Sequence, residues 1–215
     1  MKRVLLVCAA IFPLLTCSGI VYTILSLFIA ALGASKSQIG LLYTCGALAG
    51  AITSPLSGRL ADRWGRKPVL LGSMALFAGV FGGFAFVKEY TQLFPIMIAE
   101  GTAWGGLGAS VNAMIADLVP QQKRGTALGL YNATWNLGWI IGPLAGGVLS
   151  DHLGFRTTFL LCVGLISVGI ALGAFLLPRG DGGPSGPGDE PSARVPATDT
   201  PWWPQGPPSS SAPGR

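Results

Sequence analysis

Long stretches without a charged residue are the feature that most constrains the fold of this 215-residue chain. A helix needs about 20 predominantly apolar residues to cross a bilayer, because each residue advances it by about 1.5 Å. Runs of that size recur, and one of them is interrupted only by Glu100 and, near its end, by Asp117. The sequence therefore predicts an all-α membrane protein with six transmembrane helices, at residues 4–35, 37–58, 68–87, 90–118, 125–150 and 157–178.

The composition supports a lipid bilayer as the surroundings of the chain. Hydrophobic residues make up 50% of it and charged residues 11%, against about 25% charged residues in soluble domains. The net charge of +5 raises the question of nucleic acid, which needs basic residues on one continuous solvated face. Here they form small clusters between apolar runs, so we predict no nucleic-acid partner.

The cysteines and the single histidine form no catalytic or metal-binding pattern. The cysteines lie inside apolar runs without a C-x-x-C pair, which indicates small packing residues; they are Cys8, Cys17, Cys45 and Cys162. No Ser/His/Asp arrangement surrounds His152. We predict that the protein is not an enzyme and binds neither metal nor cofactor.

The beginning of the chain, "MKRVLLVCAAIFPLLTCSG", imitates a secretory signal. Signal cores are only about 7 to 15 residues long, whereas this apolar run continues to Ser35. The segment is interpreted as an uncleaved first span.

Lysine and arginine predict the orientation, because short cytoplasmic loops carry an excess of them. If the spans alternate, nine lie on one side: Lys2, Arg3, Arg59, Arg63, Arg66, Lys67, Lys123, Arg124 and Arg179. Three lie on the other: Lys36, Lys88 and Arg156. We expect a multi-pass protein of the cell membrane with both termini in the cytoplasm.

A change of composition divides the chain into two parts. Residues 1–178 hold all the predicted spans, while proline and glycine dominate residues 179–215. Such a segment has little apolar surface to offset the entropy of ordering, so a disordered cytoplasmic tail is expected.

The turn between the second and third spans carries "GRLADRWGRKPVLL". It resembles the signature loop of the major facilitator superfamily, G-x-L-A-D-R-x-G-R-K-x-x-L. The matching residues are Gly58, Leu60, Ala61, Asp62, Arg63, Gly65, Arg66, Lys67 and Leu70. The resemblance covers residues 1–178 and implies one six-helix half of that fold.

In that family the loop's charges form a network that latches the outward-facing state. The guanidinium of Arg66 can donate two parallel hydrogen bonds to a carboxylate. Asp117 lies at the expected cytoplasmic end of the fourth span, where such a partner is needed. Asp62 and Arg63 belong to the same expected network, with Asp62 alternatively facing the positive end of a neighbouring helix. A role in topology alone remains open for each of these charges.

The fifth span, "GLYNATWNLGWIIGPLAGG", fits the pattern G-x8-G-x3-G-P-x2-G-G. Its fixed positions are Gly129, Gly138, Gly142, Pro143, Gly146 and Gly147. Three of these glycines are four residues apart, so they form one smooth face for close helix packing, and Pro143 is expected to kink the helix. The pattern resembles an element of the superfamily's drug/proton antiporters. Helix packing by small residues is the alternative.

Two asparagines of the same span, Asn132 and Asn136, share a helical face. They either line a polar cavity or form hydrogen bonds with a neighbouring helix.

Glu100 is an acid near the predicted middle of the membrane, with no basic residue inside any span to pair with it. Such a residue is a functional candidate by default. Burial favours the neutral carboxyl, which suits proton coupling; a permanently protonated glutamic acid is the alternative. Antiporters of this type usually carry an arginine in the fourth span, and "AEGTAWGGLGAS" has none.

The family typically has two six-helix halves, with the transport site between them. The resemblance therefore implies proton-coupled efflux of drug-like or hydrophobic small molecules, in which this half-transporter needs a second six-helix half or a homodimer partner. The alternative is a truncated or non-transporting membrane protein that retains the motifs as packing elements.

Overall fold

The computed structural model describes residues 1–177, which are helical and contain no strand. The long helices are α1 (Lys2–Ala31), α2 (Lys36–Trp64), α3 (Arg66–Phe86), α4 (Leu93–Leu118) and α5 (Arg124–Leu176). Short 3-10 turns, η1 (Tyr90–Gln92) and η2 (Gln121–Lys123), precede α4 and α5. The all-α prediction is confirmed; the tail predicted for residues 179–215 lies outside the described residues.

A break at Gly154 divides α5 into two segments. Its backbone angles, φ 75° and ψ 165°, are not helical and suit a residue without a Cβ. Before the break, Gly146 faces Ile20 of α1. After it, Gly169 faces Ala10, which lies nearer the start of α1. The chain therefore reverses direction at Gly154, and residues 1–177 contain six long helical segments.

Several of these helices are long and apolar enough to cross a membrane. They are α1, α2, α3 and the stretch Gln121–Leu176, which holds both segments of α5. The helix α4, which carries Glu100, is long enough but less apolar, and among the described residues it does not belong to this group.

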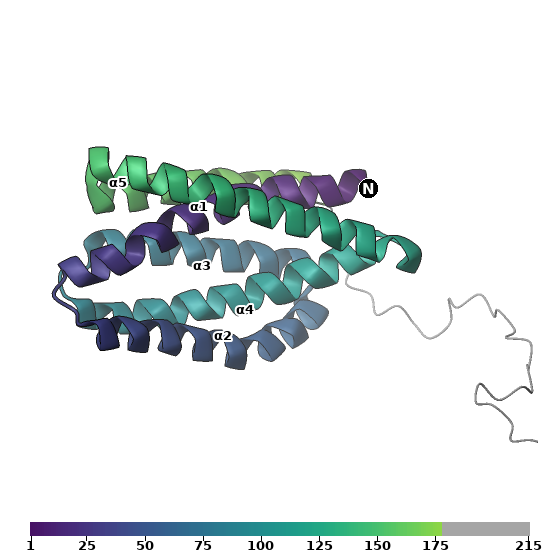
Figure 1. The fold of residues 1–215 in the computed structure, drawn as a ribbon. Coiled ribbons are helices and arrows are strands. Elements are labelled where there is room, and N and C mark those ends of the chain that lie inside the picture. The colour runs from purple at the N-terminus through teal and green to yellow at the C-terminus, as the bar shows by residue number, and fades with distance from the viewer. Residues whose placement is uncertain (178–215) are drawn as a thin grey trace, which may run out of the picture. The chain divides into compact units, whose positions relative to one another are not determined.

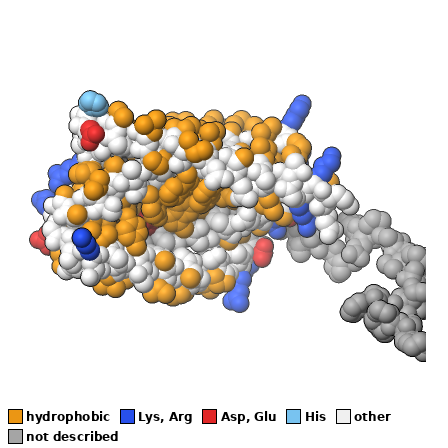
Figure 2. Space-filling model, in the orientation of Figure 1, with side chains coloured by type: hydrophobic (Ala, Val, Ile, Leu, Met, Phe, Trp, Pro, Cys, Tyr) orange, Lys and Arg blue, Asp and Glu red, His pale blue; other side chains and the backbone are white. Residues whose placement is uncertain are grey.

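Successive helices run in alternate directions (Figure 1). Two parallel pairs result, α1 with the first segment of α5 and α2 with α4, and α3 packs against α4 and α5. The N-terminus, the α2–α3 turn and the α4–α5 connection lie at one end, called the Arg66 end; the opposite end is called the Gly154 end. Charged side chains gather toward these ends, with hydrophobic surface between them (Figure 2).

Glycine allows close backbone contact within both helix pairs. A Cβ on Gly142 would lie 2.6 Å from the Cα of Gly19 in α1. In the other pair, a Cβ on Gly105 would lie 3.0 Å from the carbonyl oxygen of Gly50, and one on Gly101 would clash with the carbonyl oxygen of Gly46. Lipid tails are as apolar as leucine, so such contacts, rather than the hydrophobic effect, hold membrane helices together.

The core lies along α1, whose buried residues extend from Val4 to Ile29. Phenylalanines of α3 and α5 complete it: Phe28 meets Phe159 edge to face with ring centroids 5.2 Å apart, and Phe84 approaches Phe159 at 5.6 Å. This core leaves the outer face of α2 bare, including Leu48 and Ile52.

We predict that replacing Gly101 with alanine separates α2 from α4 and destabilises the protein by about 1–3 kcal/mol, the usual cost of overpacking. Thermal unfolding in detergent measures the change. Gly108→Ala is the matched control on the same helix, because a Cβ there meets no atom within 4 Å. Equal melting temperatures for the two variants would contradict the assigned contact.

Candidate functional site

A cavity of about 530 Å³ lies between α1, α2 and α4, and it is called the acid cavity because Glu100 is on its wall. Tyr22 of α1, Tyr43 of α2 and Trp104 of α4 contribute aromatic rings to the same wall. Glycines of the α2–α4 contact form much of the rest. One carboxyl group therefore lies among aromatic rings and peptide backbone.

Glu100 is buried, with 1% of its surface exposed. Its Oε1 atom has no hydrogen-bond partner among residues 1–177, and no lysine, arginine or histidine lines the cavity. An ionised carboxylate with an unpartnered oxygen and no cation beside it is costly in such surroundings. The site therefore calls for a proton or another cation on Glu100.

Hydrogen bonding and ring contacts position the aromatic wall. The indole Nε1–H of Trp104 donates to the hydroxyl oxygen of Tyr22 at 2.9 Å. The ring of Tyr22 also lies 6.3 Å from that of Tyr43 and 5.6 Å from that of Trp139, between centroids. These contacts connect α1, α2, α4 and α5 around the acid.

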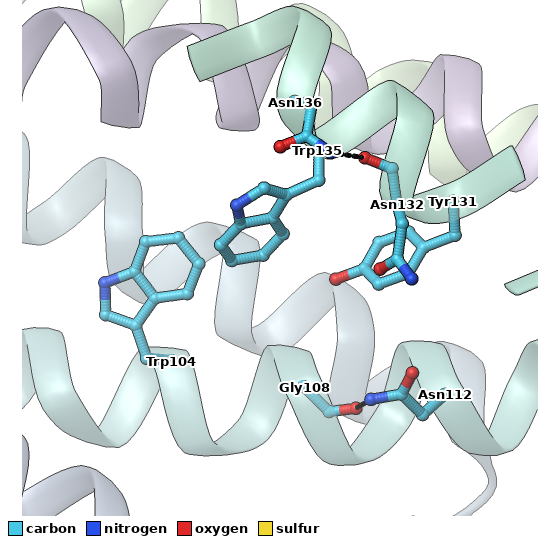
Figure 3. Close-up of a pocket in the computed structure, with 7 residues that line it drawn as sticks. All are labelled: Trp104, Gly108, Asn112, Tyr131, Asn132, Trp135 and Asn136. Atoms are coloured by element: carbon cyan, nitrogen blue, oxygen red, sulfur yellow. Dashed lines mark hydrogen bonds between the residues drawn. The ribbon is translucent and has the colours of Figure 1, made fainter. Parts of the chain in front are cut away.

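A second cavity of about 580 Å³ lies between α4 and α5 and is called the amide cavity (Figure 3). Its lining comprises Trp104, Gly108, Asn112, Tyr131, Asn132, Trp135 and Asn136. Trp104 borders both cavities. Its ring centroid lies 5.2 Å from that of Trp135, so an aromatic contact connects α4 to α5 here.

The structure places Asn132 and Asn136 on the wall of the amide cavity. Asn136 donates from Nδ2 to the backbone oxygen of Asn132 at 2.9 Å, and Asn112 bonds in the same way to Gly108 (Figure 3). Each of these two hydrogen bonds lies within a single helix, so neither joins neighbouring helices. All three asparagines are among the residues that line the cavity.

Sequence reasoning did not identify Trp104 or Asn112 as site residues, although a signal was present. Glu100, Trp104, Gly108 and Asn112 follow one another at intervals of four along α4. Residues so spaced share one helical face. That face borders both cavities.

At the Arg66 end, Arg66 forms an ion pair with Asp117 and also donates to the carbonyl oxygen of Ala113. The two side chains are 28% and 57% exposed. Gly65 ends α2 with φ 93°, which favours glycine, and places Arg66 at the start of α3. The pair thus ties the start of α3 to the end of α4.

Other charges of the signature loop are not brought into this pair. Asp62 and Arg63 are exposed, and neither forms an ion pair within residues 1–177. A Cβ on Gly58 would meet no atom within 4 Å. Lys67 instead donates from Nζ to the carbonyl oxygen of Ala174 at 2.8 Å, near the C-terminal end of α5, where the helix dipole favours a cation.

The glycines of the fifth-span pattern divide into two groups. Gly138, Gly142 and Gly146 face the backbone of α1, whereas Gly129 and Gly147 have open space where a Cβ would lie. The backbone angles of α5 stay helical at Pro143; the non-helical residue is Gly154. The reversal of the chain therefore lies at Gly154, and the kink expected at Pro143 stays a prediction.

Comparisons with known proteins agree with this architecture. The family model described as Major Facilitator Superfamily matches residues 7–206. The chain is 33% identical over 147 residues to the multi-drug resistance efflux pump PmrA of Streptococcus pneumoniae, covering 66% of this chain and 37% of PmrA.

Two further relatives match a similar part of the chain. The multidrug resistance protein MdtG of Salmonella typhi is 38% identical over 138 residues, covering 64% of this chain and 34% of MdtG. The PmrA homolog of Lactococcus lactis is 32% identical over 163 residues, covering 74% of this chain and 40% of the relative. The chain thus spans well under half the length of these relatives. The family match over most of its residues shows that the chain belongs to the major facilitator superfamily.

Proposed function

We propose that this chain is one six-helix half of a transporter that exports drug-like or hydrophobic small molecules in exchange for protons. The observation that carries the proposal is Glu100, buried and without a basic partner on the wall of a cavity large enough for a small molecule. Relatives described as multidrug efflux pumps support the substrate class.

All six helical segments cross the membrane in the proposed topology, with both termini in the cytoplasm. Support comes from the Arg66 end, where the N-terminus, the α2–α3 turn and the α4–α5 connection hold eight of the eleven lysines and arginines of residues 1–177. Short cytoplasmic loops carry such an excess. The segment α4 completes the six, since its acid faces the bundle instead of lipid.

Glu100 is the proposed coupling residue. It takes up a proton when the cavity opens to the outside and releases it when the cavity opens to the cytoplasm. No arginine precedes it in α4, so the carboxyl group carries the coupling without the arginine expected from the family pattern.

Arg66 and Asp117 form the proposed latch. Because they join α3 to α4 at one end, the pair favours the conformations in which that end is closed. Asp62 and Arg63 are exposed and Gly58 is half-buried, so the two charged side chains are available to the second half of the transporter.

The second half of the transporter, either another copy or a separate six-helix chain, covers the outer faces of α2 and α5. Both faces are apolar and bare: Leu48, Ile52 and Leu56 lie on α2, and Ile140 and Leu144 on α5. Superfamily halves are related by an axis along the membrane normal, which two copies inserted in the same direction reproduce.

One observation favours the alternative of a non-transporting membrane protein. Gly138, Gly142 and Gly146 are fully used in contacts with α1, as packing elements would be. Packing does not explain Gly129 and Gly147, which contact nothing at their Cβ positions, nor an unpaired buried acid.

We predict that Glu100→Gln reduces pH-driven drug efflux to the level of membranes lacking the protein, because glutamine has the same shape but cannot exchange a proton. Dye or drug transport in inverted vesicles, with and without a pH gradient, measures the effect. Glu89→Gln changes an exposed acid and should transport normally. Undiminished pH-driven efflux in Glu100→Gln would remove this residue from the mechanism.

We expect Asp117→Asn to destabilise the protein by up to about 1 kcal/mol, since partly exposed ion pairs contribute little. High salt should shrink the difference by screening the pair. Thermal unfolding at low and high salt provides the measurement. Asp151→Asn is the control, because exposed Asp151 forms no ion pair within residues 1–177; the same loss in both variants would contradict the latch.

If the second half is another copy, Ile52→Cys in α2 should give an oxidative disulfide dimer in native membranes. Leu27→Cys in α1 is the control, because the exposed fractions of the two native side chains are similar, 65% and 62%. Both variants need Cys45 replaced by alanine, since that thiol is free and partly exposed. Absence of the Ile52→Cys dimer in membranes that transport would exclude a homodimer through this face.

A further inference from the structure

Charge is distributed unevenly between the two ends of the bundle. The Arg66 end holds eight of the eleven lysines and arginines of residues 1–177 but only two acids, Asp62 and Asp117. The Gly154 end holds three basic and two acidic residues. The Arg66 end therefore carries a large positive excess, which lies next to the hydrophobic surface of the helices (Figure 2).

Protein partners account for part of this excess. Arg66 pairs with Asp117, and Lys67 donates to the carbonyl oxygens of Ala174 and Leu177 at the end of α5. These two cations serve contacts inside the protein, so the remaining basic residues supply the charge that faces outward.

Four of the remaining basic residues come from the starts of two helices that pack together, and they are called the basic cluster. Its members are Lys2 and Arg3 at the start of α1, and Lys123 and Arg124 at the start of α5. All four are exposed, and none forms an ion pair within residues 1–177.

The register between α1 and α5 brings the two parts of the basic cluster to the same level. A Cβ on Gly138 would lie 2.9 Å from the carbonyl carbon of Leu15, and one on Gly142 would lie 2.6 Å from the Cα of Gly19. In both contacts the residue of α5 comes 123 positions after its partner in α1. The two helices therefore run parallel with a constant offset.

Buried residues show that this register continues to the helix starts. It matches Tyr131 with Cys8 and Ala127 with Val4, and all four side chains are buried, the last two completely. One further step sets Lys2 and Arg3 beside the first turn of α5. The four cations thus lie together, although the sequence separates them by about 120 residues.

Arg124 is oriented for an acceptor outside the protein. Its Nε atom donates to the carbonyl oxygen of Ala116 at 3.2 Å, whereas its two Nη atoms make no hydrogen bond within residues 1–177. The acid next to this acceptor, Asp117, is already paired with Arg66. A Cβ on Gly125 would meet no atom within 4 Å, so there is open space next to Arg124. The paired nitrogens of a guanidinium match the oxygens of a phosphate group.

We propose that the basic cluster binds the headgroup of an anionic phospholipid, whose phosphate lies between the starts of α1 and α5. Charge complementarity identifies this partner, since four cations lie together with no acid among them. Leu5 is 52% exposed on the same face of α1 as Lys2, and it offers apolar surface to an acyl chain. Basic sites between helices on the cytoplasmic side are suited to such headgroups. In the proposed topology the lipid belongs to the cytoplasmic leaflet.

The bound lipid stabilises the packing of α1 against α5. Four like charges at one level repel one another, and this repulsion opposes the compact state. A phosphate between them removes part of the repulsion and joins the two helix starts. Because the folded chain binds the lipid and the unfolded chain lacks the site, the lipid raises the free energy of unfolding.

The test uses the full chain purified in a nonionic detergent and two lipids with identical acyl chains, anionic phosphatidylglycerol and zwitterionic phosphatidylcholine. Native mass spectrometry counts the lipids that each chain retains, and thermal unfolding measures their effect on stability. Phosphatidylglycerol should be retained preferentially and should raise the melting temperature more than phosphatidylcholine does. Equal retention and equal stabilisation by the two lipids would overturn the proposal.

Variants separate the basic cluster from the general positive charge of this end. Lys2→Gln combined with Arg3→Gln should weaken phosphatidylglycerol binding by about tenfold or more. Arg59→Gln combined with Arg63→Gln is the matched control, because it removes two exposed charges at the same end. Its affinity should stay nearly unchanged at physiological salt, where charges more than about 8 Å away are screened. Equal losses in both double variants would refute the site.

Lys123→Gln tests the other part of the basic cluster and leaves the hydrogen bond of Arg124 to Ala116 in place. It should weaken phosphatidylglycerol binding by roughly fivefold. This variant decides the matter if the first double variant cannot be purified in folded form, and unchanged affinity would then refute the proposal.

Inorganic phosphate distinguishes a lipid headgroup from a free anion. Added to lipid-free protein at the concentration used for phosphatidylglycerol, it should leave the melting temperature nearly unchanged. The same stabilisation by inorganic phosphate would assign the basic cluster to a soluble anion and overturn the lipid proposal. Lipid retention is measured without transport, so efflux by a chain that does not retain phosphatidylglycerol refutes this inference alone. Retention by a chain that transports nothing refutes only the export function.

Discussion

Close backbone contact between helices is the interaction on which the rest of this structure depends. In lipid the hydrophobic effect does not draw apolar helices together, so helix packing must come from surfaces that fit. Glycine supplies these surfaces twice, where Gly142 meets Gly19 of α1 and where Gly101 meets Gly46 of α2. Each contact makes a tight pair of helices. Glycines of the α2–α4 contact also line the acid cavity, so the same residues that bring these two helices together shape its wall.

The sequence predicted the helices well because their main determinant is local. Charge-free runs mark the helical segments, and the spacing of Gly138, Gly142 and Gly146 indicated a packing face, which the structure locates against α1. The family resemblance of the signature loop is confirmed by the match over residues 7–206.

The candidate site was only partly predictable, because its residues meet across helices. Glu100 was visible as a solitary acid in an apolar run, whereas Tyr22 and Tyr43 are ordinary aromatic residues until the register of α1 and α2 places them beside it. In the same way, the sequence grouped Asp62 with Arg66, but Arg66 pairs with Asp117 of another helix and Asp62 forms no ion pair within residues 1–177. The reversal at Gly154 falls in the gap between the predicted spans 125–150 and 157–178, because its positive φ suits a residue without a Cβ.

The reversal at Gly154 joins two long apolar segments through almost no intervening loop. Segments connected so tightly behave as a single helical hairpin during biosynthesis, because neither can enter the bilayer and leave the other far behind. The same tether limits their independent sliding in the finished protein.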